Sequence, residues 1–372
     1  MAEGDRPKLC YVLPYYDPAT GSHLAYLYEL PRRARADLDI FFITERSSVV
    51  PAGLGTGFHR IRFPWSPLRF VELVIVLGWQ RFKGRRDFYT HYSFVGALAA
   101  WFVTALAGGR AYYWNCGMPW LYRRSWLREA AFRFILRHSI LVTGTEGLAR
   151  AYTKHYGLRP AATRVVPNWI TVSRFTPLQP DANGDDARHW LGISPDAMVA
   201  LFVHRLSRRK GADRIPAIAA GVTKRVPNAM FLIVGDGPEQ QDLESRIQDL
   251  GLTGSVRLVG EVPNRDIPLY FAAADAFLMP SEEEGFPHVL LEAMAAGLPY
   301  VASDVGGVRE ITPPALQPFL VPSGDAARFA KRICAVLALP PEERTRVSAE
   351  ARAWVERYDI SRVLPKFVGL FR

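Results

Sequence analysis

The sequence predicts an α/β protein built from two doubly wound domains in tandem. Short β-rich runs alternate with longer helical patterns over most of the chain, which is the rhythm of βαβ units around a parallel sheet. This rhythm is interrupted at residues 165–190, where Pro, Asn, Asp and Gly gather, as expected for a linker. A length of 372 residues also exceeds one ordinary core, so two domains are expected.

The first series of elements predicts an N-terminal domain. Strands are expected where β-branched and aromatic residues cluster, and helices at the longer periodic segments between them. The uncharged run that begins at Phe94 is too short to span a bilayer, so it is predicted to be a buried helix. The expected strands are residues 9–15, 39–44, 87–93, 111–115 and 139–144, with helices near 22–35, at 94–107 and near 125–138.

The second series predicts a C-terminal domain with the same rhythm. Parallel sheets of this kind bind ligands at the carboxyl ends of their strands, so a cleft between two facing domains is the expected site. The domains are placed at residues 1–172 and 173–356. The expected strands are residues 198–206, 229–237, 255–261, 276–281 and 299–304, and the closing helices lie near 324–337, 340–356 and 361–371.

Composition narrows the class of protein. Lys and Arg number 46 against 36 Asp and Glu, and the net charge of +10 favours anionic partners such as nucleotide phosphates, acidic lipids or nucleic acid. Three scattered cysteines form neither a disulfide framework nor a zinc motif. The N-terminus lacks the apolar core of a signal peptide, so a cytoplasmic location is expected.

Two segments of the second domain carry candidate binding chemistry. In "VHRLSRRKGAD" (203–213), Arg205 and Lys210 follow a predicted strand and suit a diphosphate. A solvated basic loop is the alternative. In "VGDGPE" (234–239), Gly235 and Gly237 form a turn that a ligand could approach, although a plain connector has the same composition.

The stretch "EEEGFPHVLLEAM" (282–294) combines an acid cluster with a helix start. Pro287 suits the first helical position, and the amides from His288 onward would form an anion site at the positive end of the helix dipole. Glu284 precedes the helix and Glu292 lies within it, so the two carboxylates could reach hydroxyls of one extended ligand. Alternatively, Glu282 to Glu284 cap the dipole and Glu292 is a partly solvated residue.

In the first domain the candidate residues are fewer. His91 ends a predicted strand on the cleft side, where a catalytic and a structural hydrogen-bonding role are equally compatible with its position. The tripeptide "DLD" (37–39) matches a metal-binding pattern, but a charged turn before a strand explains it better.

Taken in order, the second-domain segments resemble the retaining glycosyltransferases of family four, which have the GT-B fold. The resemblance covers most of residues 160–312 and includes "HRLSRRKG", "IVGDGPE" and "EGFPHVLLEAMAAGLPYVASDVGGVREI". It implies transfer of a sugar from a nucleotide sugar with retention of anomeric configuration. It also implies two Rossmann-like domains that face each other, with a C-terminal helix at about 357–372 packing back on the first.

The resemblance assigns roles to individual residues. Arg205 and Lys210 would hold the diphosphate and neutralise charge as the nucleotide leaves. Glu284 would lie near the donor sugar, with Glu292 on the ribose hydroxyls. The remaining donor-binding candidates are Gly285, Phe286, His288 and Gly235 in the second domain, and Gly21 and Ser22 in the first. Members of this family usually need no metal, so neither a metal nor another cofactor is expected.

The sequence departs from the family pattern at three places. Pro287 has no N–H to offer the sugar, so Phe286 and His288 must supply the backbone contribution. The first βα loop keeps only Gly21, with Ser22 beside it, where the family has paired glycines. A catalytic-region histidine after the fourth strand is replaced by Asn115 and Cys116, and His91 is the candidate substitute.

Two segments of the first domain raise the question of a membrane. In residues 122–138, Leu127, Ala130, Ala131 and Phe134 form one apolar stripe that is predicted to be core, with Phe132 and Leu136 opposite it among arginines. Residues 64–86 are apolar and aromatic and end in a basic cluster. Both segments suit either an anionic membrane surface or a buried helix with a solvated basic rim.

The leading hypothesis is therefore a glycosyltransferase, with UDP-sugars favoured as donors. Its acceptor would be a sugar, a lipid or a lipid-linked sugar, as in cell-envelope, polysaccharide or glycolipid synthesis, with peripheral binding to the inner face of the cytoplasmic membrane as an option. Another GT-B enzyme of nucleotide sugars, such as an epimerase, is the alternative. A non-enzymatic binder of anionic surfaces or nucleic acid would show steep salt dependence, but the sequence has no base-stacking motif, so nucleic acid is not expected.

Overall fold

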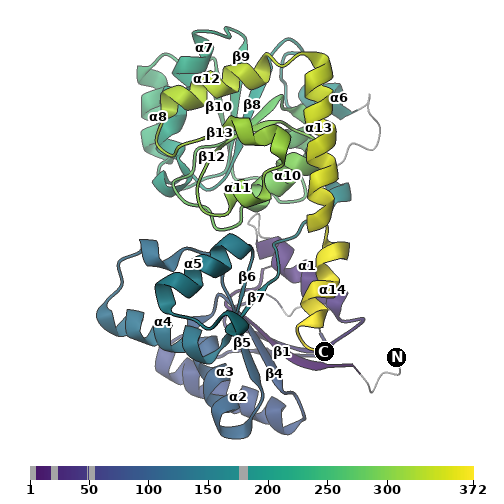
Figure 1. Ribbon diagram of the computed structural model, residues 1–372. Coiled ribbons are helices and arrows are strands. Elements are labelled where there is room, and N and C mark those ends of the chain that lie inside the picture. Colours follow the sequence, from purple (N-terminus) through teal and green to yellow (C-terminus); the bar gives the residue numbers. More distant parts are fainter. Residues whose placement is uncertain (1–5, 18–23, 48, 50–54, 176–182) are drawn as a thin grey trace. The chain divides into compact units, whose positions relative to one another are not determined.

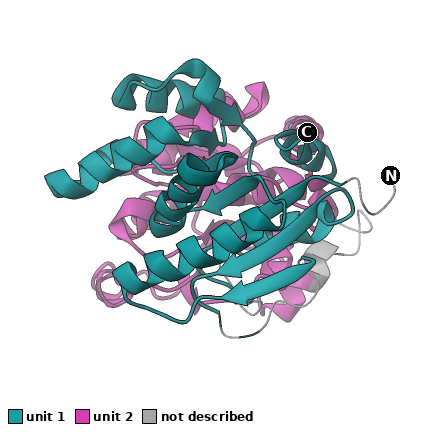
Figure 2. Cartoon of the chain, turned by 90° about the horizontal axis from the view of Figure 1, so that it is seen from below, with its two compact units in different colours: residues 1–168, 361–372 teal, residues 169–360 magenta. Residues whose placement is uncertain are grey.

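The computed structural model describes residues 6–17, 24–47, 49, 55–175 and 183–372. The chain forms two compact units, coloured separately in Figure 2. Unit 1 comprises Met1–Asn168 and Ser361–Arg372, and unit 2 comprises Trp169–Ile360. Each unit contains one parallel sheet flanked by helices, which confirms the predicted α/β class (Figure 1).

The sheet of unit 1 has the strand order β3-β2-β1-β4-β5-β6-β7. Every pairing in it is parallel, and the order reverses between β1 and β4, which is the topological switch point of a doubly wound sheet. The strands are β1 (Lys8–Leu13), β2 (Asp39–Thr44), β3 (Gly57–Arg60), β4 (Asp87–His91), β5 (Arg110–Trp114), β6 (Ile140–Thr143) and β7 (Thr163–Val165).

The helices of unit 1 cover this sheet. Ser93 caps α3 by accepting a hydrogen bond from the Gly96 amide, and the helix buries Ala99, Ala100 and Val103 in the core shared with α2. The helices are α1 (Leu24–Ala34), α2 (Ser66–Phe82), α3 (Phe94–Ala107), η2 (Pro119–Leu121), α4 (Trp126–His138), α5 (Glu146–Tyr156) and η3 (Pro160–Ala162).

Helix α14 (Ile360–Gly369) lies against the unit 1 sheet although it ends the chain. The ring of Phe367 meets that of Tyr89 edge-on at 5.2 Å. The Tyr112 hydroxyl donates to the Leu370 carbonyl at 2.7 Å, and Arg110 Nη2 donates to the Phe371 carbonyl at 3.3 Å. Aromatic packing and backbone hydrogen bonds therefore hold the end of the chain on β4 and β5.

Unit 2 repeats the design with the strand order β10-β9-β8-β11-β12-β13. Its pairings are also parallel, and the order reverses between β8 and β11. The strands are β8 (Met198–Val203), β9 (Ala229–Val234), β10 (Val256–Gly260), β11 (Ala276–Met279), β12 (Tyr300–Ser303) and β13 (Leu320–Val321). Their helical connections are η4 (Val172–Arg174), α6 (Asn183–Trp190), η5 (Arg208–Lys210), η6 (Ala212–Arg214), α7 (Ile215–Thr223), α8 (Gln240–Asp249), α9 (Ile267–Ala273), α10 (His288–Ala296), α11 (Val308–Ile311), η7 (Pro314–Phe319), α12 (Ala326–Leu337), α13 (Pro341–Val355) and η8 (Glu356–Tyr358).

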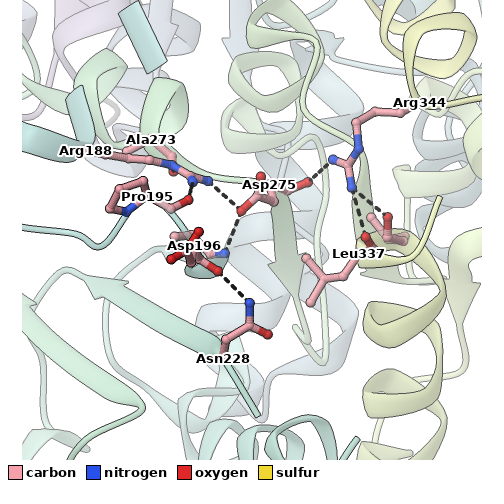
Figure 3. A network of polar contacts seen from close by, with 10 residues as sticks. Arg188, Pro195, Asp196, Asn228, Ala273, Asp275, Leu337 and Arg344 are labelled. Carbon is pink, nitrogen blue, oxygen red and sulfur yellow. Dashed lines mark hydrogen bonds and ion pairs between the residues drawn. The ribbon is translucent and has the colours of Figure 1, made fainter. Parts of the chain in front are cut away.

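An arginine network fixes the amino-terminal ends of β8 and β11 (Figure 3). Asp275 Oδ2 accepts hydrogen bonds from Arg188 Nη2 and from the Val199 amide, both at 2.7 Å. The Asp275 carbonyl accepts from Arg344 Nη1 at 2.8 Å, and Arg344 also donates to the end of α12 at Leu337. This network occupies the edge opposite the one where a parallel sheet binds ligands, so its role is structural.

The predicted apolar stripe of α4 is wrong. Leu127 is 61% exposed, whereas Phe132 and Leu136 are buried. Phe132 packs edge-on against the rings of Tyr113 in β5 and Tyr156 in α5. Helix α4 carries apolar residues on two faces, and its packing against the sheet and α5 selects the face that periodicity alone did not.

Candidate functional site at the switch point of unit 2

The loops after β8 and β11 meet at the switch point of unit 2. Gly211 follows η5 in the left-handed conformation (φ +74°), and a Cβ there would lie 2.1 Å from the Pro280 carbonyl oxygen. Only glycine therefore allows the two loops to approach this closely. This approach brings the basic segment 208–214 against the acidic segment 282–284.

A buried ion pair joins the two loops. Lys210 Nζ lies 2.8 Å from Glu284 Oε1, and their side chains are 11% and 6% exposed. The Ser281 hydroxyl donates to the same carboxylate oxygen at 2.8 Å. Burial raises the pKa of Glu284, but Lys210 and His204 outweigh it and hold this pKa well below its ordinary value. Glu284 is therefore a fixed negative charge at neutral pH.

His204 is the third partner of Glu284, and sequence reasoning missed it. Its Nε2 lies 3.5 Å from Glu284 Oε1, while its Nδ1 accepts the Arg205 amide at 2.9 Å. An acceptor role for Nδ1 assigns the proton to Nε2, which faces the carboxylate. Burial and then Lys210 lower the pKa of His204, so it is neutral at pH 7. Its place directly after a strand, beside Arg205, is the signal that could have identified it.

The two other acids of the segment 282–284 pair with cations of the loop after β8. Glu282 Oε1 lies 2.5 Å from Arg214 Nη2, and Glu283 Oε1 lies 3.1 Å from Arg209 Nη1. The Glu282 amide also donates to the Arg209 carbonyl at 2.9 Å. These acids, which the sequence suggested as dipole-facing loop residues, thus bind the β11 loop to the β8 loop.

Helix α10 begins one residue later than predicted. Pro287 is the N-cap, with extended backbone angles (φ −76°, ψ 115°), and His288 is the first helical residue. The first-turn amides of a helix have no carbonyl partner within it, so an anion site at this end remains chemically reasonable. Glu292 is buried within α10 at 5% exposure, which excludes the alternative of a partly solvated residue.

The segment between Glu284 and α10 is also anchored. The ring of Phe286 meets that of Tyr358 edge-on at 5.5 Å, and Phe286 and His288 are both buried. Gly285 between them and Glu284 is half-buried. The Glu284 carbonyl accepts the Gly307 amide at 3.2 Å, so the loops after β11 and β12 are joined as well.

Gly235 and Gly237 pack against the β8 loop. A Cβ at Gly235 would lie 2.0 Å from the His204 carbonyl oxygen, and one at Gly237 would lie 2.3 Å from that of Leu206. Both residues have positive φ angles. Their requirement for glycine is thus explained by backbone packing, and ligand contact at Gly235 stays a prediction. Arg205, in the same loop, has an exposed side chain.

His91 occupies the position in unit 1 that corresponds to the loop after β11 in unit 2. It ends β4 beside β1, at the switch point, and is fully buried. Its Nδ1 lies 3.1 Å from the Tyr11 hydroxyl, and its ring stacks on Trp114 at 3.8 Å. The next residue, Tyr92, has φ +57°, and such strained backbone at a strand end is typical of functional sites.

The remaining candidates of unit 1 have structural partners or lie outside the described residues. Asn115 Oδ1 accepts the Gly117 amide at 2.8 Å, and burial raises the pKa of the Cys116 thiol, so this pair offers no nucleophile. Asp39 of the "DLD" tripeptide pairs with Arg85 at 2.6 Å. Gly21 and Ser22 lie outside the described residues. Within the described ranges, no group of three or more His, Cys, Asp and Glu residues could hold a metal.

The match to a known protein family lies entirely within unit 2. Residues 185–354 match the family described as glycosyl transferases group 1. A D-inositol 3-phosphate glycosyltransferase of Geodermatophilus obscurus is 34% identical over 242 residues, which cover 62% of this chain and 52% of that protein. The chain thus spans about half the length of this relative.

Solved structures extend the similarity of fold to both units. The structure of Anabaena Alr3699/HepE in complex with UDP and glucose has a TM-score of 0.81 at 19% identity, covering 98% of this chain and 99% of that one. Sucrose-phosphate synthase from Thermosynechococcus elongatus has a TM-score of 0.83 at 22% identity, with 99% and 98% covered. The expected GT-B fold is confirmed by these likenesses and by the two parallel sheets.

Proposed function

We propose that this chain, whose residues 185–354 match the glycosyl transferases group 1, transfers a sugar from a nucleotide sugar to a hydroxyl group. The observation that carries the proposal is the Lys210–Glu284 pair at the switch point of unit 2, beside the start of α10. A cation, a fixed carboxylate and a helix N-terminus suit the diphosphate and the hydroxyls of one extended ligand.

In this proposal Lys210 and Arg205 bind the diphosphate. An ammonium group has three N–H donors, so Lys210 can donate to a phosphate while it keeps its bond to Glu284. As the bond between the sugar and the diphosphate breaks, negative charge grows on the leaving nucleotide, and cations fixed beside it lower the barrier. We infer that these cations suffice without a metal. Retained transfer in the presence of a chelator would support this, and loss restored by a divalent cation would contradict it.

Glu284 and Glu292 act on different parts of the donor. Glu284 stays ionised because Lys210 and His204 hold it, so we assign it to positioning the sugar and stabilising positive charge at the reacting carbon, not to proton donation. Glu292, buried in α10, would accept hydrogen bonds from the ribose hydroxyls through its carboxylate, with Gly285, Phe286 and His288 between the two acids. We propose retention of anomeric configuration, which product analysis by nuclear magnetic resonance would test.

The donor and acceptor classes are further parts of the proposal. A UDP-sugar is favoured by the motif pattern, and the HepE structure holds UDP and glucose. For the acceptor we propose a lipid or lipid-linked hydroxyl, as in cell-envelope, polysaccharide or glycolipid synthesis, at the inner face of the cytoplasmic membrane. The first relative acts by its name on D-inositol 3-phosphate, so a small soluble acceptor belongs in the same screen.

Calorimetric titration with UDP, GDP and ADP tests the site. The wild-type chain should bind one of them, and Lys210→Ala should weaken that binding at least about tenfold, because charge-assisted hydrogen bonds to a phosphate are lost. Arg209→Ala, one residue away and 54% exposed, is the matched control and should bind like the wild type. Failure of folded wild-type protein to bind any of the three would overturn the proposal. Mass spectrometry of products from a nucleotide-sugar panel then identifies the donor.

A further inference from the structure

Helix α2 of unit 1 has apolar side chains on two faces. Leu73 and Leu77 are fully buried against α3 and the sheet, and α2 packs along α3 (Figure 1). A second set of apolar side chains, spaced by three or four residues, forms a stripe on the outer face. This stripe consists of Leu68 (43% exposed), Val71 (51%), Ile75 (65%), Trp79 (56%) and Phe82 (82%).

The stripe continues beyond the helix. Phe63 and Trp65, just before α2, are 45% and 65% exposed, and Leu106 at the end of α3 is 75% exposed. At the carboxyl-terminal end of α2 the rings of Trp79 and Phe82 stack, with their centroids 5.8 Å apart. A contiguous exposed apolar surface of this kind marks an interaction site in a soluble protein.

The exposed charges around the stripe are of one sign. Residues 57–86 contain seven Lys and Arg residues and one acid, Glu72. Two of the cations are largely buried and paired with acids, Arg69 with Glu45 and Arg85 with Asp39. The exposed cations are Arg60, Arg62, Lys83 and Arg86. Glu72 is 11% exposed, and its carboxylate accepts the amides of Arg62 and Phe63. Lys83 Nζ lies 5.4 Å above the ring of Trp79, at the end of the stripe. The exposed charge beside the apolar surface is therefore positive, and its complement is an anionic surface.

We propose that α2 lies flat on an anionic lipid bilayer, with the stripe in the lipid and the flanking cations on the head groups. Tryptophans near both ends of an apolar face and basic residues beside it are the features of a helix that lies in a membrane interface. The buried face with Leu73 and Leu77 ties α2 to unit 1, so the helix cannot leave to cross the bilayer. Among the described helices, none is long and apolar enough to do so.

A second copy of the chain fits the stripe less well. Both ends of α2 carry exposed cations, Arg62 at one end and Lys83 and Arg86 at the other. Two copies related by a twofold axis would bring the same patch together, in the antiparallel case with cations facing cations. The proposal rests on the surface of unit 1 and not on the transfer reaction, so it can fail or succeed independently of the proposed function.

Vesicle flotation with the full chain tests the proposal. Vesicles of phosphatidylcholine mixed with phosphatidylglycerol should carry the wild-type chain upward, and vesicles of phosphatidylcholine alone should carry much less. Replacing Ile75, Trp79 and Phe82 together by Ser should abolish flotation, because each serine removes a large apolar contact with the lipid. The matched control replaces Trp190 and Leu250 of unit 2, which are 81% and 51% exposed, by Ser and should float like the wild type.

Charge variants separate the two contributions to binding. Lys83→Gln should weaken binding to anionic vesicles by about fivefold, which is the typical effect of one basic residue near such a surface. Its nucleotide affinity should stay unchanged, which verifies the fold. Wild-type chain that stays at the bottom with anionic vesicles, or a triple serine variant that still floats, would overturn the proposal. So would a concentration-dependent dimer in sedimentation that the triple variant converts to monomer.

Discussion

In unit 2 the loops on either side of the switch point meet through charge, whereas in unit 1 the corresponding strands meet through aromatic rings. Lys210 after β8 binds Glu284 after β11 at 2.8 Å. In unit 1, Tyr11 of β1 and His91 of β4 are joined by a hydrogen bond, and Trp114 stacks on His91. The same topology thus carries a fixed charge pair in one unit and a buried aromatic cluster in the other.

The outer surfaces of the units differ as well. Among the described residues, the exposed large apolar side chains of unit 2 are Trp190 and Leu250, and all others lie in unit 1. Many of these belong to α2 and to the segment from η2 into α4. The charged site of unit 2 suits a charged ligand, and the amphiphilic surface of unit 1 suits a lipid surface. The two proposals above therefore assign donor recognition to unit 2 and membrane binding to unit 1.

Glu284→Gln should have the largest effect and tests whether charge defines the unit 2 site. It leaves the Lys210 ammonium buried beside a neutral group, so the free energy of unfolding should fall by about 3 kcal/mol. The transfer rate should fall by about a hundredfold, as expected when one preorganised electrostatic contact is removed. Denaturant titration and initial rates measure these two effects.

The adjacent variant Glu283→Gln is the control for Glu284→Gln. Glu283 pairs with Arg209, whose side chain is 54% exposed, so the cost should be below about 1 kcal/mol with little change in rate. Equal losses in the two variants would mean that the whole acid cluster acts as one structural unit and that Glu284 has no separate role.

The fold was predictable from the sequence because the information is local. The ordered motifs of residues 160–312 each lie within a short segment, and residues 185–354 match the family described as glycosyl transferases group 1. The predicted strand at 39–44 and helix at 94–107 match β2 and α3. Strands β3, β7 and β13 were missed, because edge strands of two to four residues have too few side chains to show a period.

The contacts within the site were less predictable because they join distant segments. Lys210 and Glu284 were each identified, but they are 74 positions apart in the sequence, which hides their ion pair. His204 was missed for the same reason, because its role depends on its contact with Glu284. Pro287 was placed one residue too far into α10 because residue type fits both the N-cap and the first turn. In α4, apolar residues on two faces left the buried side undetermined until its neighbours were known.

His91→Gln tests the unit 1 half of the comparison and should have the next largest effect. If His91 contributes to the chemistry, the turnover number should fall by about tenfold to a hundredfold, as is typical for removal of a positioned imidazole. Affinity for the nucleotide should change little, because Lys210, Arg205 and Glu292, which are proposed to bind it, lie in unit 2. Exposed His138 in α4 is the matched control, and His138→Gln should leave both quantities unchanged.

A loss of nucleotide affinity in His91→Gln as large as its loss of turnover would contradict this division of roles. An unchanged turnover number would assign His91 to the packing of β1, β4 and β5 alone. Thermal melting of the variant separates either result from unfolding, because His91 is fully buried.

The pH dependence of the free energy of unfolding is expected to be a smaller effect than the two above, and it concerns unit 2 alone. Burial and Lys210 hold the pKa of folded His204 below its ordinary value of 6.5. As the pH falls, His204 is therefore protonated in the unfolded chain before it is protonated in the folded chain. The free energy of unfolding should therefore fall as the pH drops through about 6.5. Glu284 adds to this loss only at lower pH, below its ordinary pKa of 4.5, because its folded pKa is depressed.

His204→Gln isolates the contribution of His204. Glutamine can still donate to Glu284 but does not titrate, so the slope of stability between about pH 7 and pH 5 should flatten. Lys210 and Arg209 both disfavour the charged imidazole, and Glu284 favours it, so these groups set the slope together. His189, exposed in α6, is the control, and His189→Gln should leave the slope unchanged, as measured by denaturant titration across pH. An unaltered slope in His204→Gln would assign the titration to another group.

The exposed start of α4 should give the smallest effect and shows how far the amphiphilic surface of unit 1 extends. Trp126 and Leu127 are 77% and 61% exposed, and Arg123 and Arg128 beside them are exposed too. Replacing Trp126 and Leu127 by Ser should change the free energy of unfolding by less than about 0.5 kcal/mol, because neither is packed. If α4 touches the bilayer beside α2, vesicle binding should weaken by a few-fold but not vanish. Flotation as strong as that of the wild type would confine the lipid contact to α2. Complete loss would make α4 the principal contact instead of α2.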